Sequence, residues 1–240
     1  ENADIVFIGE YHNNPIAHRL QLEITKELGK SKKLVLGAEM FEADNQSELS
    51  DYLTGAIDAA GLDSTARLWN NYKTDYAPLV NYAKDNNLPF IATNIPRRYA
   101  NLVYKKGFEA LDSLTQEEKS WIAPLPIYYD AELPEYKGMM EMMGEHSSPT
   151  MPMAQASKDA TMAYFISQNL QDDTIFIHYN GSYHSDNHGS IISYLLRTNP
   201  DLEIMTITTV EQADVYTLLD ENQAKADFII CVDEDMTKTY

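Results

Sequence analysis

The sequence predicts an α/β protein in which a largely parallel central sheet is flanked by helices and carries a helical insertion. Short apolar runs rich in β-branched residues alternate with helical patterns along most of the 240 residues. Most of these runs are continuously apolar, which is typical of strands buried on both faces of a parallel sheet. One long internal stretch keeps a helical pattern without a convincing strand. We expect a single α/β domain over 1–240, a length that one core can serve.

Six segments have the length and composition of buried strands, and each is followed by a polar or turn-forming stretch. Their order along the chain, strand then helix then strand, favours a parallel sheet with helical crossovers. The expected strands are 4–8, 33–38, 89–92, 174–178, 203–208 and 227–232.

Helices are expected between these strands. The first has the clearest start, because Asn14 suits the N-cap and Pro15 suits the first helical position. Apolar residues then recur every fourth position until Gly29. Four further helices are expected at 75–86, 97–106, 155–170 and 189–197.

The insertion spans about 109–154 and is helical, acidic and rich in methionine. Six of its methionines fall within 15 residues, between Met139 and Met153. Methionine fills irregular cores and forms adaptable apolar surfaces, so we interpret the cluster as core or as a platform for a flat ligand or a partner. A third interpretation is metal binding through the thioether sulfurs. We interpret the segment as a lid or subdomain.

Composition excludes several classes of function. Lys and Arg number 18 against 37 Asp and Glu, which gives a net charge of −19, whereas a nucleic-acid binder needs a basic footprint. The one cysteine, Cys231, allows neither an intramolecular disulfide nor a Cys-based zinc site, and its apolar surroundings predict a buried strand residue. No apolar window of about 18 residues is present to span a membrane.

Polar side chains that can bind ligands follow four of the predicted strands. Glu10 and His12 follow the first strand, and Glu39 follows the second. Arg97 lies beyond the third strand and His184 beyond the fourth. Ligands bind at the carboxyl ends of the strands in open α/β sheets, so we expect these five residues to line one crevice.

Two of these loops share a Gly-x-x-His spacing, from Gly9 to His12 and from Gly181 to His184. Glycine permits a sharp turn at a strand end, and the imidazole three residues later can then point into the crevice. Two histidines and two carboxylates suit a divalent metal that keeps an open position for water. The candidate metal ligands are Glu10, His12, Glu39 and His184.

The same residues suit a hydrolase. His12 and His184 would bind the metal or carry protons, Glu10 or Glu39 would act as the base, and Arg97 would steady a developing oxyanion. A structural role for each histidine stays open, because histidine is commonly part of the packing. A buried Glu39 would in any case need a partner such as Arg97 or a metal.

Five segments carry a resemblance to a known family: 9–18 (GEYHNNPIAH), 37–41 (GAEMF), 88–97 (LPFIATNIPR), 154–163 (AQASKDATMA) and 180–184 (NGSYH). Together they resemble the ChaN-like family of haem-binding bacterial lipoproteins, within the wider group of Tiki/TraB proteins and erythromycin esterases. The resemblance runs from residue 4 to about 208. Asn13 stands where the family often has Asp.

The resemblance implies haem binding for haem and iron acquisition, with haem as the cofactor. It also implies a periplasm-facing lipoprotein at the bacterial outer membrane, whose signal and lipidated Cys lie outside these 240 residues. The implied partners are a second copy of the chain that shares the haem and an outer-membrane haem receptor.

Candidate axial haem ligands lie in the insertion, where apolar side chains could cover the porphyrin. Tyr phenolate and His imidazole both ligate haem iron, and the candidates are Tyr128, Tyr129 and His146. Two hypotheses therefore stand. We favour a haem-binding protein, and the alternative is a metal-dependent hydrolase of the esterase or peptidase type.

Overall fold

A computed structural model describes residues 3–143 and 148–240, and it places all six expected strands in one parallel sheet. The order across the sheet is β3-β2-β4-β1-β5-β6. The strands are β1 (Ile5–Glu10), β2 (Lys33–Glu42), β3 (Phe90–Asn94), β4 (Thr174–Gly181), β5 (Ile204–Gln212) and β6 (Phe228–Asp233). The predicted fold class is confirmed.

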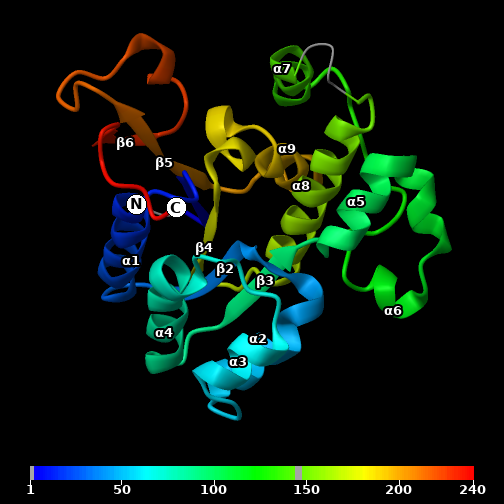
Figure 1. The fold of residues 1–240 in the computed structure, drawn as a ribbon, viewed down its shortest axis with the longest axis horizontal. Coiled ribbons are helices and arrows are strands. Elements are labelled where there is room, and N and C mark those ends of the chain that lie inside the picture. The colour runs from blue at the N-terminus through cyan, green and yellow to red at the C-terminus, as the bar shows by residue number, and fades with distance from the viewer. Residues whose placement is uncertain (1–2, 144–147) are drawn as a thin grey trace.

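Helices cover both faces of the sheet, as Figure 1 shows. One face carries α1 (Pro15–Gly29), α2 (Gln46–Thr54), α3 (Ala59–Thr65) and α4 (Ala77–Asp85). The other carries α8 (Met151–Gln168) and α9 (Ile191–Thr198), with α5 (Arg97–Lys106) packed on α8. Because β1 is central, Val6 and Ile8 pack on the first face while Ile5 and Phe7 pack on the second. This explains the continuously apolar strands.

The first helix begins as the sequence predicts. The Asn14 side chain accepts a hydrogen bond from Ala17 N at 2.9 Å, and Pro15 is the first helical residue. The helix expected at 75–86 is α4, preceded by one π-helical turn at Tyr72–Tyr76. Helices α2 and α3 were not expected, because their sequences are polar and each has few buried residues.

The insertion contains less regular helix than expected. Its described part holds a 3-10 turn (Phe108–Ser113), α6 (Gln116–Lys119) and α7 (Pro134–Met143), joined by irregular chain. A separate apolar cluster ties residues 108–127 to α5 and α8. The methionines divide between the core and the platform interpretations, since Met153 packs against this apolar cluster while Met142 is 80% exposed.

Cys231 lies in β6 as expected but is only half-buried. Strand β6 forms the edge of the sheet, so fewer neighbours cover it than cover the central strands. Among the described residues, none of the helices combines the length and apolarity that crossing a bilayer requires.

Candidate functional site

A large cleft lies at the carboxyl ends of the strands, near the point where the crossover helices change from one face of the sheet to the other. Strands β1 and β4 are neighbours, yet β1 leads into α1 on one face and β4 leads toward α9 on the other. Such a switch point opens a crevice in doubly wound sheets. The cleft has a volume of about 970 Å³, and its lining includes His12, Glu39, Trp69, Asn94, Arg97 and Lys158.

The strands extend further than the sequence suggested. Glu10 is the last residue of β1, Glu39 lies inside β2, and Gly181 is the last residue of β4. The carboxylates are therefore held by the sheet itself and not by loops. The expectation that glycine turns the chain here is wrong, because Gly9 and Gly181 both lie within strands.

Gly181 is needed for close packing instead. A Cβ at this position would lie 2.8 Å from His12 Nε2 and 3.5 Å from Glu39 Oε2, so any side chain would displace the imidazole. The backbone of Gly181 thus separates His12 from Glu39, and the two halves of the site meet across it.

Glu10 is the centre of the first half. Its Oε1 accepts hydrogen bonds from His12 Nδ1 at 2.9 Å and from the Tyr76 hydroxyl at 2.8 Å. Its Oε2 accepts one from Gln21 Nε2 at 2.6 Å and lies 3.3 Å from His18 Nδ1. Both carboxylate oxygens are fully engaged by the protein.

These hydrogen bonds set the ionisation states of Glu10 and His18. Burial alone would raise its pKa, but the hydrogen bonds from His12 and His18 outweigh burial and lower the pKa to about 2. Burial likewise opposes the charge on His18, yet the bond to Glu10 raises its pKa to about 9. Glu10 is therefore a charged anchor, and His18 is its buried counter-ion.

His12 is the one histidine of the site that reaches the cleft. Its Nδ1 is bound to Glu10, so Nδ1 carries the proton and Nε2 remains free to accept one in the neutral ring. The imidazole packs edge-on against Trp69 with ring centroids 4.7 Å apart, and its side chain is 33% exposed. Burial lowers its pKa, but the Glu10 hydrogen bond and the Glu39 charge together raise it.

Glu39 and His184 form the second half with Asp159 of α8. Glu39 Oε2 accepts a hydrogen bond from Gly181 N at 2.8 Å, and Glu39 Oε1 lies 3.3 Å from His184 Nε2. His184 Nδ1 lies 2.5 Å from Asp159 Oδ1. The expected partner of Glu39 was Arg97 or a metal, but the structure supplies His184 and a backbone amide.

Both nitrogens of His184 therefore face carboxylates. Burial alone would lower its pKa, yet the charges of Glu39 and Asp159 raise it to about 9. The same contact holds the pKa of Glu39 well below its usual range, although burial opposes this. At neutral pH His184 is a buried cation beside the Glu39 carboxylate, whereas burial raises the pKa of Asp159.

Helix α7 of the insertion completes this triad. The hydroxyl of Tyr136, a side chain only 1% exposed, donates to Asp159 Oδ2 at 3.0 Å. The neighbouring Glu135 accepts a hydrogen bond from Ser190 N at 2.6 Å. Ser190 has a φ of 50°, a left-handed conformation that is unusual for a residue with a side chain. The insertion thus supports both Asp159 and the loop after His184.

Sequence reasoning found the carboxylates and histidines but missed much of their support. Gln21 and Tyr136 carry no pattern that separates them from ordinary helix residues.

His178, the end of an expected strand, is buried and its burial lowers its pKa to about 4, so it is a neutral core residue. Arg97 lines the cleft as expected but is exposed at its mouth.

The four candidate metal ligands come together, but in two separate halves. The Glu10 oxygens and the His184 nitrogens are already engaged by neighbouring side chains. Within 3–143 and 148–240, no group of three or more His, Cys, Asp or Glu side chains is arranged to hold a metal ion.

The haem-ligand candidates lie away from this cleft. Tyr128 is 42% exposed, and its ring lies under the guanidinium of Arg197, 3.6 Å from the ring centroid. Tyr129 is half-buried and packs against Phe108 and Tyr136. His146 lies outside the described residues.

Fold and site together define an α/β protein with paired histidines and carboxylates at a strand-end cleft. A family model described as "Haem-binding uptake, Tiki superfamily, ChaN" matches residues 1–195, and the chain belongs to this family. The predicted family is confirmed.

The chain is also similar to two solved structures and to one protein sequence. The fold resembles ChaN of Campylobacter jejuni, a structure described as showing cofacial heme binding, with a TM-score of 0.68, 17% identity, and coverage of 95% of this chain and 86% of that one. An erythromycin esterase EreC mutant in its open conformation matches with a TM-score of 0.51, 10% identity, and coverage of 87% and 70%. These two likenesses show the shared fold.

In sequence, the chain is 30% identical over 131 residues to the Arabidopsis thaliana protein RETICULATA-RELATED 5, chloroplastic. That match covers 51% of this chain and 18% of the relative, so the chain spans only a small part of the curated protein's length.

Proposed function

We propose that this chain binds haem and serves haem and iron acquisition. The family match over residues 1–195 carries the proposal. The likeness in fold to ChaN of Campylobacter jejuni, described with cofacial heme, supports it.

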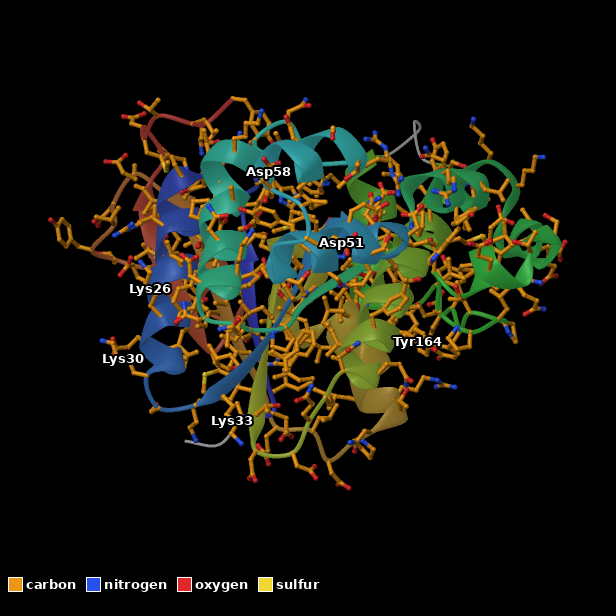
Figure 2. The ribbon with its side chains drawn as sticks, turned by 90° about the horizontal axis from the view of Figure 1, so that it is seen from below. Lys26, Lys30, Lys33, Asp51, Asp58 and Tyr164 are labelled. Atoms are coloured by element: carbon orange, nitrogen blue, oxygen red, sulfur yellow. The ribbon has the colours of Figure 1, made fainter. Side chains whose placement is uncertain are left out.

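The described residues offer a surface that fits haem on the helical side of the molecule. A groove of about 450 Å³ lies between α8, α9 and residues 123–128. A porphyrin needs an apolar wall, an axial ligand and cations for its propionates. The groove supplies Ile127 and Ala163 as wall, the exposed Tyr128 as ligand, and Arg197 as cation. Tyr164, labelled on α8 in Figure 2, lines the same groove.

Tyr128 is the ligand we assign, because its phenol is exposed at this groove whereas Tyr129 packs against other aromatic rings. Bound haem supplies the ferric iron to be carried. The chain's own contribution is a ligand oxygen, an apolar wall and a positive charge at its edge.

A haem titration of the purified protein, followed by absorbance in the Soret region, tests the proposal. We expect a saturable shift whose band position reports tyrosine ligation. Tyr128→Phe should remove the tyrosine signature, while Tyr216→Phe, at a side chain 97% exposed and outside the groove, should not. No saturable shift would refute haem binding. An unchanged spectrum in Tyr128→Phe would refute only the ligand assignment.

The partners implied by haem uptake stay part of the proposal. Because the groove is open to solvent, a second copy could cover the outer haem face, and half-integral or cofacial stoichiometry in the titration would support such a dimer. Transfer to an outer-membrane haem receptor and a lipid anchor facing the periplasm also belong to the proposal. Cell fractionation of the native protein tests the location.

The strand-end cleft supports a second candidate function, a hydrolase. The observation that favours it is His12, whose Nδ1 is fixed by Glu10, while Nε2 has no hydrogen-bond partner among the described residues and the side chain lines the cleft. This is the arrangement of a general base oriented by a carboxylate. In the reaction His12 Nε2 takes a proton from water, and the water oxygen bonds to a carbonyl carbon. The bond to the leaving group then breaks, and His12 returns the proton to the leaving oxygen or nitrogen.

Turnover of ester and amide substrates tests this second candidate. We expect His12→Gln to abolish turnover, and His188→Gln, at a half-exposed histidine outside the cleft, to leave it unchanged. Assays with and without EDTA separate a metal-dependent reaction from a metal-free one. Absence of turnover with and without added divalent metals would end the hydrolase hypothesis without affecting haem binding.

A further inference from the structure

The cleft beside His12 brings together two positive side chains that form no ion pair within the described part of the chain. Arg97 stands at the start of α5, and Lys158 lies half-buried on α8. Both line the cleft together with His12 and Glu39. Lys158 is near enough to Glu39 for its charge to favour the ionised carboxylate. Neither cation is needed to neutralise Glu39, which already has His184.

Elsewhere in the described part of the chain, eight of the other sixteen basic residues form ion pairs. Arg67, also at the cleft, is bound to Glu42 and Asp44, and Arg98 is bound to Asp44. At the opposite end of the sheet, Lys26 and Lys30 of α1, labelled in Figure 2, pair with glutamates on the same helix. In a chain with a net charge of −19, the cleft thus places two cations that lack an ion pair among the described residues beside a candidate base.

A polar atom in the same wall also lacks a partner. Asn94 lines the cleft and is 8% exposed. Its Nδ2 donates to the Glu39 carbonyl at 2.9 Å, which fixes the amide and leaves Oδ1 as the unpaired end. This Oδ1 is the buried side-chain atom that lacks a hydrogen-bond partner among the described residues. A buried acceptor without a donor is costly, and a ligand N–H or O–H is one group that would satisfy it.

We propose that the cleft takes a small organic anion, with its carboxylate or phosphate group held by Arg97 and Lys158 and a hydrogen-bond donor directed to Asn94. This assignment rests on the second candidate function where it concerns turnover, because it places the ligand's reacting bond beside His12. It names the substrate class as an ester or amide that carries a negative charge. The Tyr128 groove is a separate site and is unaffected by it.

Binding is measured first in the His12→Gln variant, in which turnover of the probes is expected to stop. N-(4-nitrophenyl)succinamic acid carries an amide N–H and a carboxylate, and 4-nitroacetanilide has the same amide without the charge. Calorimetry should show saturable binding of the acid and much weaker binding of the neutral amide. Phenyl phosphate as a competitor distinguishes a phosphate site from a carboxylate site. General adsorption of anions is disfavoured on so acidic a protein, so saturation would report a specific site.

Variants of the two cations test the assignment to this cleft. Lys158→Gln and Arg97→Gln should each weaken binding of the acid about ten- to hundredfold, as expected for loss of a charge-assisted hydrogen bond. Lys33→Gln, at an exposed lysine that begins β2 away from the cleft, is the matched control. The haem titration of each variant should match that of the wild type.

Equal binding of the acid and the neutral amide, or undiminished binding by both cleft variants, would overturn the proposal. Binding without turnover of mono-4-nitrophenyl succinate would support it and count against the hydrolase. Turnover of that ester and of 4-nitrophenyl acetate with equal kcat/KM, with no binding preference, would keep the hydrolase and remove the anion site.

Discussion

His12 and His184 occupy equivalent positions in the sequence, but their imidazole rings differ in hydrogen bonding and in exposure. Each stands three residues after a glycine that lies in a strand, and each is hydrogen-bonded to a buried carboxylate. His12 has one nitrogen bound and one open at the cleft, with a third of its side chain exposed. His184 has both nitrogens against carboxylates and is 4% exposed.

This difference shows that the shared Gly-x-x-His spacing predicts where each histidine lies, at a strand end, but not what its side chain does. Carboxyl groups on both sides make His184 a buried cation at neutral pH, which holds Glu39 and Asp159 together across β2 and α8. A single carboxylate on His12 orients the ring and leaves it able to exchange a proton. We therefore expect substitution of His184 to lower the stability of the fold, and substitution of His12 to lower turnover.

The largest effect is expected from His184→Asn. Two buried carboxylates would lose the cation that they share, and breaking a buried pair by removing one partner costs about 3–5 kcal/mol. Denaturant unfolding of wild type and variant measures the loss. His188→Asn, at a histidine on the surface, is the control and should change stability by less than about 0.5 kcal/mol. A comparably small loss in His184→Asn would mean that the buried triad does not hold the fold.

The pH dependence of stability tests whether His184 is a buried cation. The pKa of His184 is raised from 6.5 to about 9, so its stabilisation is fully present below pH 6.5 and is lost as the pH rises toward 9. The stability difference between wild type and His184→Asn should therefore shrink over this range, by at most about 1.4 kcal/mol per pH unit. Unfolding curves from pH 6 to 9 measure it. A constant difference would show that His184 is neutral in the folded protein.

A smaller effect is expected from Tyr136→Phe. The change removes the hydroxyl that donates to Asp159 Oδ2, and loss of a hydrogen bond to a buried charged group costs about 1.5–3 kcal/mol. Tyr129→Phe, in a half-buried neighbouring ring, is the matched control for the loss of a phenol. Equal stability of the two variants would mean that α7 does not support the triad.

The sequence predicts the sheet well because its physical signal is local. Runs such as 34–38 of β2 are continuously apolar, and their position between turn-forming stretches suffices to place them. Their carboxyl ends are harder to predict, because Glu39 and Asn180 are polar residues inside strands and interrupt the apolar pattern. Burial of Glu39 is possible only because His184 and Gly181 N compensate it, and those contacts span more than 140 residues.

The parts of the site that sequence reasoning missed depend on such distant contacts. Tyr136 lies in an irregular insertion and reaches Asp159 only when α7 packs on α8. Gln21 reaches Glu10 because Asn14 and Pro15 fix the start of α1 beside β1. Nothing local distinguishes these residues from ordinary helix residues, so their roles follow from the tertiary structure.

The smallest effect on stability is expected from His12→Asn, and it tests the comparison most directly. Glu10 would keep the hydrogen bonds from Tyr76 and Gln21 and the nearby charge of His18, so its burial stays compensated. The loss should be about 1 kcal/mol, the value of one hydrogen bond at a partly exposed site. Because the pKa of His12 is raised above 6.5, this contribution is fully present below pH 6.5 and falls as the pH rises beyond that value. Unfolding of the His12→Asn and His184→Asn variants under the same conditions gives the ratio. If His12→Asn cost as much as His184→Asn, the open nitrogen of His12 would be a structural contact, and its assignment as the proton carrier of the cleft would fail together with the predicted contrast.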